Sequence, residues 1–396
     1  MTAHDPAWRR NLFVCLAGSF STIVAMTLLL PFLPLYVQQL GVRDPAAVVQ
    51  WSGIAFGATF LTAALTAPLW GRLGDRYGRK VNLIRASLGM AVAMSLIGLA
   101  QNVWELVALR LLVGLLGGYS SGSMVLVAAQ TPKDRSGWAL GMLSAGIMAG
   151  NLVGPLIGGV APGLVGIRAT FFVAGAVIFL SFLATAFLIK EEKRPPKAPG
   201  AKSIGAWAQI PDTRPVVAML ITGTLLMVAT MSIEPIITVY VAQFTAAPHV
   251  TFVAGLVMSV AALGSAISAA QLGKLADRIG HWRVVIVCLA AAAVLLVPQA
   301  FVTADWQLIG LRFLMGLALG GLLPCMTAVI RHNAPEAVTG TLLGYAISTQ
   351  YAGQVIGPLA GGFVGGHFGM RAVFLGTCLI MAIGAVGNLL VARRQV

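Results

Sequence analysis

The sequence GRLGDRYGRK, residues 71–80, is the most polar ten-residue stretch in a chain dominated by apolar residues, and an almost uninterrupted apolar run lies on each side of it. Of the 396 residues, 58% are hydrophobic and 10% are charged, whereas soluble domains carry roughly 25% charged residues. Apolar runs of about 20 residues are long enough to cross the hydrocarbon core of a bilayer as helices. These features predict an all-α polytopic membrane protein in which residues 71–80 form a loop between two spans.

Three other classes of protein fit the sequence poorly. The apolar runs are continuous rather than alternating, which excludes a transmembrane barrel. The net charge of +14 comes from bases in short loops rather than on one soluble face, so we expect no nucleic-acid partner. The cysteines are scattered singly through apolar runs, which predicts buried thiols and no metal site.

The run from Asn11 continues into PFLPLYV without a cleavage site, so we interpret it as a span rather than a secretory signal.

Twelve spans are predicted from the apolar runs. They cover residues 11–39, 51–71, 81–100, 103–128, 137–162, 167–189, 215–243, 251–272, 282–302, 305–330, 339–365 and 370–392.

The distribution of Lys and Arg predicts the orientation of these spans. Most of the 26 basic residues lie at the termini and in the loops after every second span. The opposite loops hold only Arg43, Arg168 and Arg371, and Arg110 and Arg312 lie inside spans. By the positive-inside rule, both termini are cytoplasmic, and we expect a multi-pass protein of the inner membrane.

The segment KEEKRPPKAPGAKSIGAWAQIPDTRP from Lys190 is the only long hydrophilic stretch. Its Pro, Lys and Gly content is typical of a linker. We therefore expect a six-helix half at residues 1–189, a cytoplasmic linker at 190–214 and a second six-helix half at 215–396.

The two halves resemble each other at a nearly constant offset. ALRLLVGLLGG from Ala108 matches GLRFLMGLALGG from Gly310, so Arg110 aligns with Arg312. GIRATFF from Gly166 matches GMRAVFL from Gly369, and GKLADRIGHWR repeats residues 71–80. Shared apolar composition does not align rare Arg and Asp residues, so we predict a duplicated unit with a cavity between the halves.

These motifs resemble the major facilitator superfamily over the whole chain. Residues 71–80 match its loop pattern G-x-L-a-D-R-x-G-R-K, and GIMAGNLVGPLIGG resembles the motif of its proton-coupled antiporters. PFLP and Arg110 match two further motifs of its twelve-helix drug:proton antiporter branch. The resemblance implies a twelve-helix fold in two pseudo-symmetric halves and proton-coupled export of drugs.

The fifth predicted span carries glycines every four residues, together with a proline. Small residues at this spacing let helix backbones approach closely, and proline bends a helix. Generic packing is one interpretation. The sharper hypothesis is a tight contact with a helix of the other half, where Thr349, Gly353, Gly357 and Gly361 repeat the spacing. The motif residues are Gly146, Gly150, Gly154, Pro155, Gly158 and Gly159.

The polar loop is predicted to act as a cytoplasmic gate. The positive-inside rule explains its bases but not Asp75, whose carboxylate would be stabilised at the N-terminus of the helix that begins near Thr339. We hypothesise a latch between the halves, weaker in the second copy, where His281 replaces Arg79. The glycines would keep the turn compact. The candidate residues are Gly71, Gly74, Asp75, Arg76, Gly78, Arg79, Lys80, Asp134 and Asp277.

Two ionisable residues within spans are candidates for proton coupling. Charges in the membrane interior are costly and are functional candidates by default. Arg110 would tune a carboxyl or water site, although an arginine that is satisfied by carbonyls or reaches the interface is an equal alternative. Glu234 precedes Pro235, where the helix is expected to break, and burial would favour its neutral form. The alternative is a wetted Glu234 at the span end.

The candidates for a substrate cavity are polar or flexible residues within spans near the helix breaks. Hydrogen bonding between helices is the alternative for the polar ones, and simple packing is the alternative for methionine. These candidates are Tyr36, Asn151, Met227, Tyr240, Gln350 and Gln354.

The sequence lacks a phosphate-binding G-x-x-x-x-G-K-[ST] loop, which favours transport driven by a gradient and needing no cofactor. We expect a proton-coupled exporter of amphipathic or hydrophobic compounds that alternates between two facing states as a monomer. A transporter of one metabolite such as a sugar is the first alternative. A membrane-embedded enzyme, which would need clustered catalytic residues, and a sensor or scaffold are the others.

Overall fold

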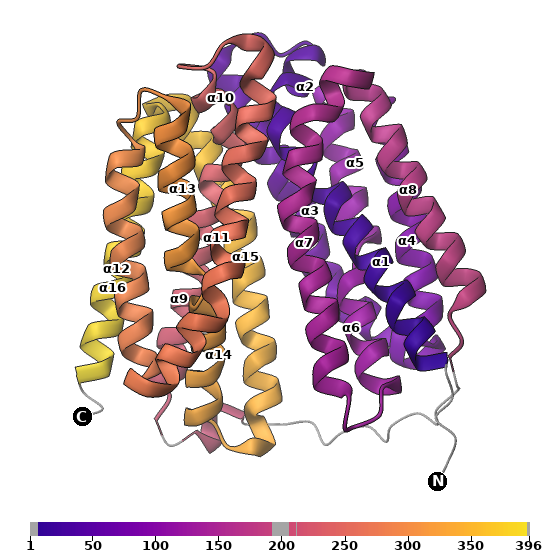
Figure 1. The fold of residues 1–396 in the computed structure, drawn as a ribbon, viewed down its shortest axis with the longest axis vertical. Helices are drawn as coiled ribbons and strands as arrows, with labels where there is room; N and C mark the ends of the chain where they lie inside the picture. The colour runs from indigo at the N-terminus through magenta and orange to yellow at the C-terminus, as the bar shows by residue number, and fades with distance from the viewer. Residues whose placement is uncertain (1–6, 192–205, 211, 394–396) are drawn as a thin grey trace. The chain divides into compact units, whose positions relative to one another are not determined.

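The computed structural model describes residues 7–191, 206–210 and 212–393. Regular structure in these ranges is helical throughout (Figure 1). This confirms the all-α prediction. Because lipid offers no hydrogen bonds to the backbone, a helix satisfies its polar groups within one segment.

The first half of the chain contributes the helices up to Leu188. They are α1 (Ala7–Thr27), η1 (Leu30–Phe32), α2 (Leu33–Gln39), α3 (Pro45–Tyr77), α4 (Arg79–Ile97), α5 (Val103–Leu116), α6 (Tyr119–Gln130), α7 (Ser136–Val165) and α8 (Ile167–Leu188).

The second half repeats this order. It contains η2 (Ala206–Gln209), α9 (Arg214–Ile233), η3 (Glu234–Ile236), α10 (Ile237–Val241), η4 (Ala247–His249), α11 (Val250–Ile279), α12 (His281–Gln299), α13 (Asp305–Leu319), α14 (Leu322–Asn333), α15 (Glu336–Phe368) and α16 (Met370–Arg393).

Among the described residues, 11 helical segments are long and apolar enough to cross a membrane. The helix α15, 33 residues long, matches the remaining predicted span. Several spans are interrupted, because Pro31 and Pro235 lie in short 3₁₀ turns and Gly118 adopts a positive φ of 100° between α5 and α6.

Four pairs of consecutive long helices are joined by a single glycine. Gly78, Gly166, Gly280 and Gly369 have φ values of 103°, 85°, 98° and 84°. A side chain would strain the backbone in this region, whereas glycine enters it at little cost. The chain therefore reverses without a loop, and the repeated GIRA and GMRA motifs mark two of these joints.

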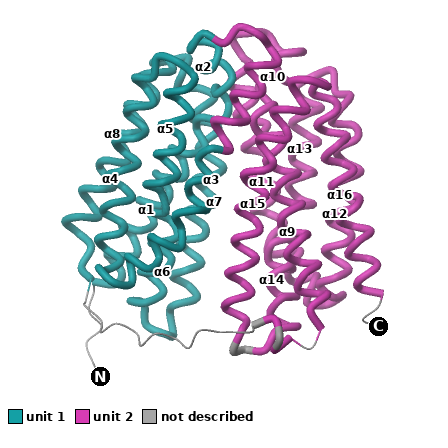
Figure 2. Tube along the Cα trace, turned by 180° about the vertical axis from the view of Figure 1, so that it is seen from behind, with its two compact units in different colours: residues 1–41, 58–198 teal, residues 42–57, 199–396 magenta. Residues whose placement is uncertain are grey.

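The chain divides into two compact units (Figure 2). Unit 1 comprises residues 1–41 and 58–198, and unit 2 comprises residues 42–57 and 199–396. The first turns of α3 thus belong to unit 2, where Gly53 lies against the backbone of Pro358 in α15. Residues 192–205 of the predicted linker 190–214 lie outside the described residues, and the division into six-helix halves stays a prediction.

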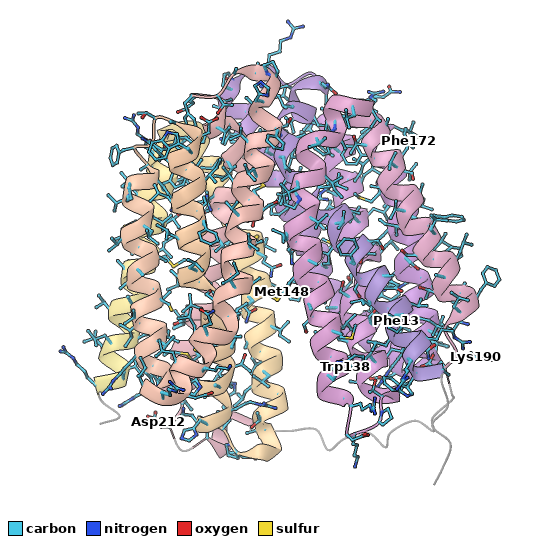
Figure 3. The ribbon with its side chains drawn as sticks, viewed as in Figure 1. Phe13, Trp138, Met148, Phe172, Lys190 and Asp212 are labelled. Atoms are coloured by element: carbon cyan, nitrogen blue, oxygen red, sulfur yellow. The ribbon has the colours of Figure 1, made fainter. Side chains whose placement is uncertain are left out.

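Each unit exposes large apolar side chains along its helices. Phe13 of α1 and Phe172 of α8, both labelled in Figure 3, are 56% and 42% exposed. In unit 2, Val294 of α12 and Leu379 of α16 are similarly exposed. Such surface suits lipid rather than water.

The glycine stripe of α7 faces α1 within unit 1. A Cβ at Gly150 would lie 2.9 Å from the side chain of Ile23, and one at Gly158 would meet the backbone of Leu28. The hydroxyl of Thr27 also donates to the carbonyl of Gly150 at 3.4 Å. The stripe therefore brings two helices of one unit into backbone contact.

Unit 2 repeats this contact between α15 and α9. A Cβ at Gly353 would lie 2.6 Å from the Thr224 carbonyl, and one at Gly361 would meet the Ser232 backbone. The sequence hypothesis placed the glycine stripes of α7 and α15 against helices of the opposite half. In the structure, each stripe packs against the first long helix of its own unit. Spacing alone predicts a close contact but does not identify the partner helix.

Replacement of Gly158 by leucine is predicted to destabilise unit 1. The added side chain has no space beside Leu28, so we expect the free energy of unfolding to fall by about 1–3 kcal/mol. Chemical unfolding of the purified protein in mixed micelles measures this change.

Gly141→Leu in the same helix provides the control, because no atom lies within 4 Å of a Cβ at Gly141. Equal stability of the two variants would contradict the packing described here.

Candidate functional site

The polar stretch 71–80 is almost entirely helical, contrary to the predicted loop. Residues 71–77 form the last turns of α3, and only Gly78 separates it from α4. Gly71 borders open space and Gly74 approaches Asn82, so Gly78 alone makes the turn compact. Across this joint, the Asp75 carboxylate at the end of α3 and the Arg79 guanidinium at the start of α4 form an ion pair at 3.8 Å.

Two further groups fix Arg79 and the start of α4. The Arg79 guanidinium donates through Nη1 to the Val125 carbonyl of α6 at 2.7 Å. The Glu191 carboxylate accepts from the backbone N–H groups of Arg79 and Lys80 at 2.9 and 2.7 Å. An acidic group at a helix N-terminus satisfies free N–H groups and opposes the positive end of the dipole.

Sequence reasoning assigned Glu191 to the linker and missed this role. The available signal was an acid placed one residue after the end of an apolar run and facing a basic stretch. The end of α8 is also tied to α1, because Asn11 donates to the Lys190 carbonyl at 2.7 Å and accepts from its N–H at 3.1 Å.

The second copy of the stretch has the same local geometry in unit 2. Gly280 forms the joint, and Asp277 at the end of α11 lies 3.4 Å from His281 at the start of α12. In unit 1, Asp134 lies 3.8 Å from its neighbour Arg135. The latch between the halves stays a prediction.

Arg110 is completely buried in unit 1, between its packed helices. Its carbonyl accepts from the Thr59 hydroxyl of α3 at 3.0 Å, and Gly114, one turn later, has no room for a side chain beside the Thr59 backbone. Arg110 thus lies at a close crossing of α3 and α5. An arginine that reached the membrane surface would be exposed, so this alternative is wrong.

Glu234 lies in unit 2 at the predicted helix break. It begins η3, between α9 and α10, and is partly buried. Its charge interacts with that of Arg312 on α13, which is 7% exposed. Among the described residues, the Arg312 atoms Nε and Nη2 make no hydrogen bond. The charges of Glu234 and Arg312 therefore influence each other, although the structure of the described residues shows no hydrogen bond or ion pair that joins the two side chains directly.

The two predicted cavity tyrosines occupy equivalent positions in their units. The Tyr36 hydroxyl donates to the Ile97 carbonyl, and the Tyr240 hydroxyl donates to the Gln299 carbonyl at 2.8 Å. Both side chains are buried. These contacts favour the structural alternative, in which each phenol ties the broken first helix of its unit to a neighbouring helix.

Three of the other cavity candidates gather in unit 2, between α9 and α15. Gln354 lies 3.8 Å from the Met227 sulfur, and a Cβ at Gly223 would lie 3.4 Å from Gln350. In unit 1, Asn151 is exposed and donates to the Ile147 carbonyl of its own helix at 3.2 Å. The partly buried amides and the flexible thioether thus lie together where α9 meets α15.

Arg85 is a second residue that the sequence analysis missed, because it was counted with the loop after the second span. It lies within α4, stacks 3.5 Å above the Trp70 ring and donates to the carbonyls of Leu116 and Gly117. It therefore caps the end of α5, where the fourth span breaks.

Within the part of the chain that the structure describes, no group of three or more His, Cys, Asp or Glu side chains suits a metal ion. The polar groups instead lie at helix breaks and joints inside apolar helices. This arrangement defines a helical membrane protein built from two related units, with ionisable groups at the broken helices. Such groups can hold or release a proton within the membrane.

The chain belongs to the Major Facilitator Superfamily, whose sequence profile matches residues 15–253 and 219–395. Multidrug resistance protein MdtG of Enterobacter lignolyticus is 43% identical over 389 residues, which cover 98% of this chain and 93% of that protein. MdtG of Dickeya zeae is 41% identical over 391 residues, covering 98% and 96%. The family resemblance predicted from the motifs is thus confirmed.

Solved structures show the same fold at low sequence identity. A bacterial homolog of the human lysosomal transporter Spinster, in an inward-facing and unoccupied conformation, has a TM-score of 0.82 and 14% identity. That comparison covers 99% of this chain and 98% of the other. The nucleoside transporter NupG has a TM-score of 0.73 and 14% identity, covering 96% and 99%.

Replacement of Glu191 by alanine is predicted to loosen the start of α4. Two backbone N–H groups would lose their acceptor, at a cost of about 1 kcal/mol, as for other N-cap losses. We expect faster hydrogen exchange at residues 79–82, measured by mass spectrometry.

Glu191→Gln, which keeps one acceptor oxygen, is expected to fall between the wild type and Glu191→Ala. Unchanged exchange in the alanine variant would show that Glu191 does not hold this helix end.

Proposed function

We propose that this protein is a proton-coupled exporter of amphipathic or hydrophobic drug-like compounds. The similarity to proteins named multidrug resistance protein MdtG, over nearly the whole chain, supports the substrate class. We further propose that it acts as a monomer in the inner membrane with both termini in the cytoplasm, as the distribution of basic residues indicates.

The observation that supports proton coupling is the placement of Glu234 at a helix break, within electrostatic range of the buried Arg312. The two residues lie on different helices of unit 2, and Glu234 is at a helix break. When Glu234 is ionised, its charge and that of the buried Arg312 guanidinium attract each other across η3 and α13. When it takes a proton, that attraction is lost and the arginine charge needs another partner or water.

Protonation of Glu234 can therefore bias the position of α10 and η3 relative to α13. A ligand or proton shifts a conformational equilibrium only through different affinities for the two states. The two residues supply such a difference. For an ionised Glu234, a state that keeps the carboxylate near the buried Arg312 is favoured over a state that separates them. Export follows if the proton-bound and drug-bound forms prefer opposite facing states.

The repeated carboxylates Asp75 and Asp277 are proposed to act at the cytoplasmic side as gates rather than as substrate contacts. Each is exposed and paired with the residue that starts the next helix. The partner of Asp75 is held more firmly than that of Asp277. The Arg79 guanidinium donates to the Val125 carbonyl, and Glu191 caps the start of α4. We therefore expect the first gate to contribute more to transport.

Cells that produce the protein are expected to extrude a fluorescent cationic dye, and a protonophore should abolish this efflux. In proteoliposomes, Glu234→Gln should lower gradient-driven efflux roughly tenfold or more, the effect of losing about 1.4 kcal/mol of coupling. Dye exchange without a gradient should persist in this variant, because the glutamine removes only the titrating group.

Glu105→Gln is the matched control. Asn102 caps α5, the Glu105 carboxylate accepts from the Asn102 side-chain amide, and glutamine keeps an oxygen that can accept this bond. If Glu234→Gln pumped like the wild type at every pH, Glu234 would have no part in coupling. Efflux that ignores the protonophore would contradict the proposed energy source.

Asp75→Asn is predicted to reduce transport more than Asp277→Asn does. The asparagine keeps the shape of the side chain but removes the charge that Arg79 or His281 meets. Initial rates of dye efflux at matched membrane expression measure the difference, and the reverse order would contradict the proposed asymmetry.

A further inference from the structure

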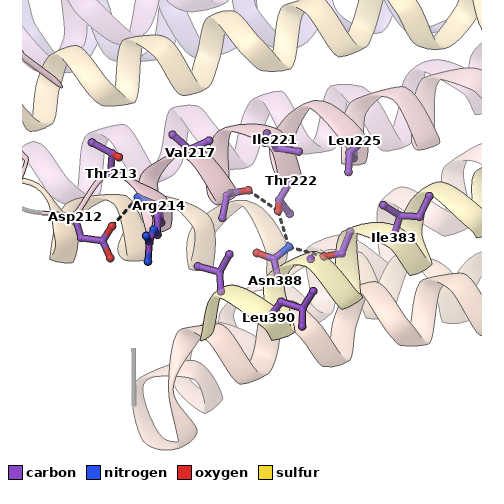
Figure 4. A pocket seen from close by; sticks show the side chains of 14 residues that line it. Asp212, Thr213, Arg214, Val217, Ile221, Thr222, Leu225, Ile383, Asn388 and Leu390 are labelled. Carbon is purple, nitrogen blue, oxygen red and sulfur yellow. Dashed lines mark hydrogen bonds between the residues drawn. The ribbon is translucent and has the colours of Figure 1, made fainter. Parts of the chain in front are cut away.

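Unit 2 contains a crevice between the first turns of α9 and the last turns of α16 (Figure 4). Its volume is about 670 Å³, within the range of small-molecule pockets. Glu234, Arg312, Met227, Gln350 and Gln354 do not line it. The crevice is therefore separate from the residues proposed for coupling and from the candidates for the drug cavity.

The walls of the crevice are largely apolar. Val217, Ile221 and Leu225 line it from α9, and Ile383 and Leu390 line it from α16. Ile221 and Ile383 are more than half exposed, so the crevice opens on a surface of membrane-spanning helices. A molecule dissolved in lipid can enter from that side.

One polar group deep in the crevice has an unused acceptor. Asn388 of α16 is 3% exposed, and its Nδ2 donates to the Thr222 hydroxyl and to the Gly384 carbonyl, both at 2.7 Å. Its Oδ1 points away from both partners (Figure 4) and makes no hydrogen bond with any described residue. The Thr222 hydroxyl does not donate to Asn388 Oδ1, because it already donates to the Ala218 carbonyl at 2.7 Å.

Unit 1 closes the equivalent place with its own hydroxyl groups. Counted from the aligned joints Gly166 and Gly369, Thr185 corresponds to Asn388 and Ser181 to Gly384. In unit 1, Ser181 and Ser21 of α1 share a hydrogen bond of 2.7 Å, and Thr185 shares one of 2.7 Å with the Tyr119 hydroxyl.

Unit 2 has lost these bridging hydroxyls. When the two units are aligned at Tyr36 and Tyr240, Leu225 corresponds to Ser21. Gly384 corresponds to Ser181, as the aligned joints show. No serine bridge is possible between these two residues. The replacement of a closed contact by glycine, leucine and a longer amide leaves both space and an acceptor.

The geometry points to a binding site for a neutral, membrane-dissolved amphipathic molecule that carries a hydroxyl donor on an apolar body. The hydroxyl donates to Asn388 Oδ1, and the apolar body lies along Ile221, Leu225 and Ile383. A neutral donor fits Asn388 better than an ammonium group, because one amide oxygen does not compensate the desolvation of a charge. The Asp212 carboxylate, which also lines the crevice, is exposed before the start of α9 rather than buried beside Asn388. Occupation of this site does not depend on the proposed transport function, since it concerns one unit and needs no proton gradient.

Photolabelling of the purified, full-length protein in phospholipid nanodiscs tests this site. The probes are a ten-carbon primary alcohol with a terminal diazirine and its methyl ether, which has the same chain but no donor. Mass spectrometry should find the alcohol on residues 214–225 and 383–391 roughly 3- to 10-fold more often than the ether, as expected for one buried hydrogen bond.

Asn388→Leu should reduce labelling by the alcohol to the level of the ether. Asn333→Leu is the matched control, because Asn333 lies in unit 2 but does not line the crevice, and it should leave the preference unchanged. Gly387→Leu is a second test that keeps Asn388. A Cβ at Gly387 meets no atom within 4 Å, so its side chain should fill the crevice and suppress labelling by both probes.

Equal labelling of the wild type by the alcohol and the ether would overturn the proposal, as would a preference that survives Asn388→Leu. A diazirine-bearing phospholipid that labels the crevice and is not displaced by the alcohol would identify a lipid-filled groove instead. Each result is read from binding alone, so it is independent of success or failure in the efflux assays.

Discussion

The fold depends on the close backbone approach between the first and fifth long helices of each unit. In lipid, burial of apolar surface contributes little to the association of helices. Close packing of small residues against backbone must therefore provide the favourable energy. Gly158 against Leu28 and Gly361 against Ser232 provide this contact. Because α1 and α9 are held along their length, the breaks at Pro31 and Pro235 occur at defined positions.

The two units share the features that hold them together and differ in those that carry chemistry. Both have a buried arginine, a buried tyrosine bonded to a carbonyl and glycine joints between helices. At the aligned helix breaks, however, unit 1 has Leu30 where unit 2 has Glu234. Unit 1 instead has Arg85 and Trp70 at the end of α5. Duplication supplied a stable scaffold, and substitutions in one copy then gave that unit side chains that the other unit lacks.

Much of this organisation could be predicted from the sequence, because membrane helices leave strong local signals. Continuous apolar runs predicted the spans, and Pro235 predicted the break that follows Glu234. The polar stretch 71–80 was misjudged as a loop because charge was taken as a sign of irregular structure. A helix end tolerates charges well, and the one residue that needs a special backbone angle is Gly78. Glu191 was missed because it was counted with the linker, and the backbone N–H groups that it binds can belong to residues of almost any type.

By itself, the sequence determined the helical class, the number and approximate limits of the spans, the internal duplication and the family. These follow from hydropathy, from rare residues repeated at a constant offset and from local motifs. Only the tertiary structure decided which helix each glycine stripe meets, which base lies near Glu234 and which polar atoms remain without a partner, as at Asn388. Such pairings depend on the positions of residues far apart in the chain, and a pattern along one helix specifies a face but not its neighbour.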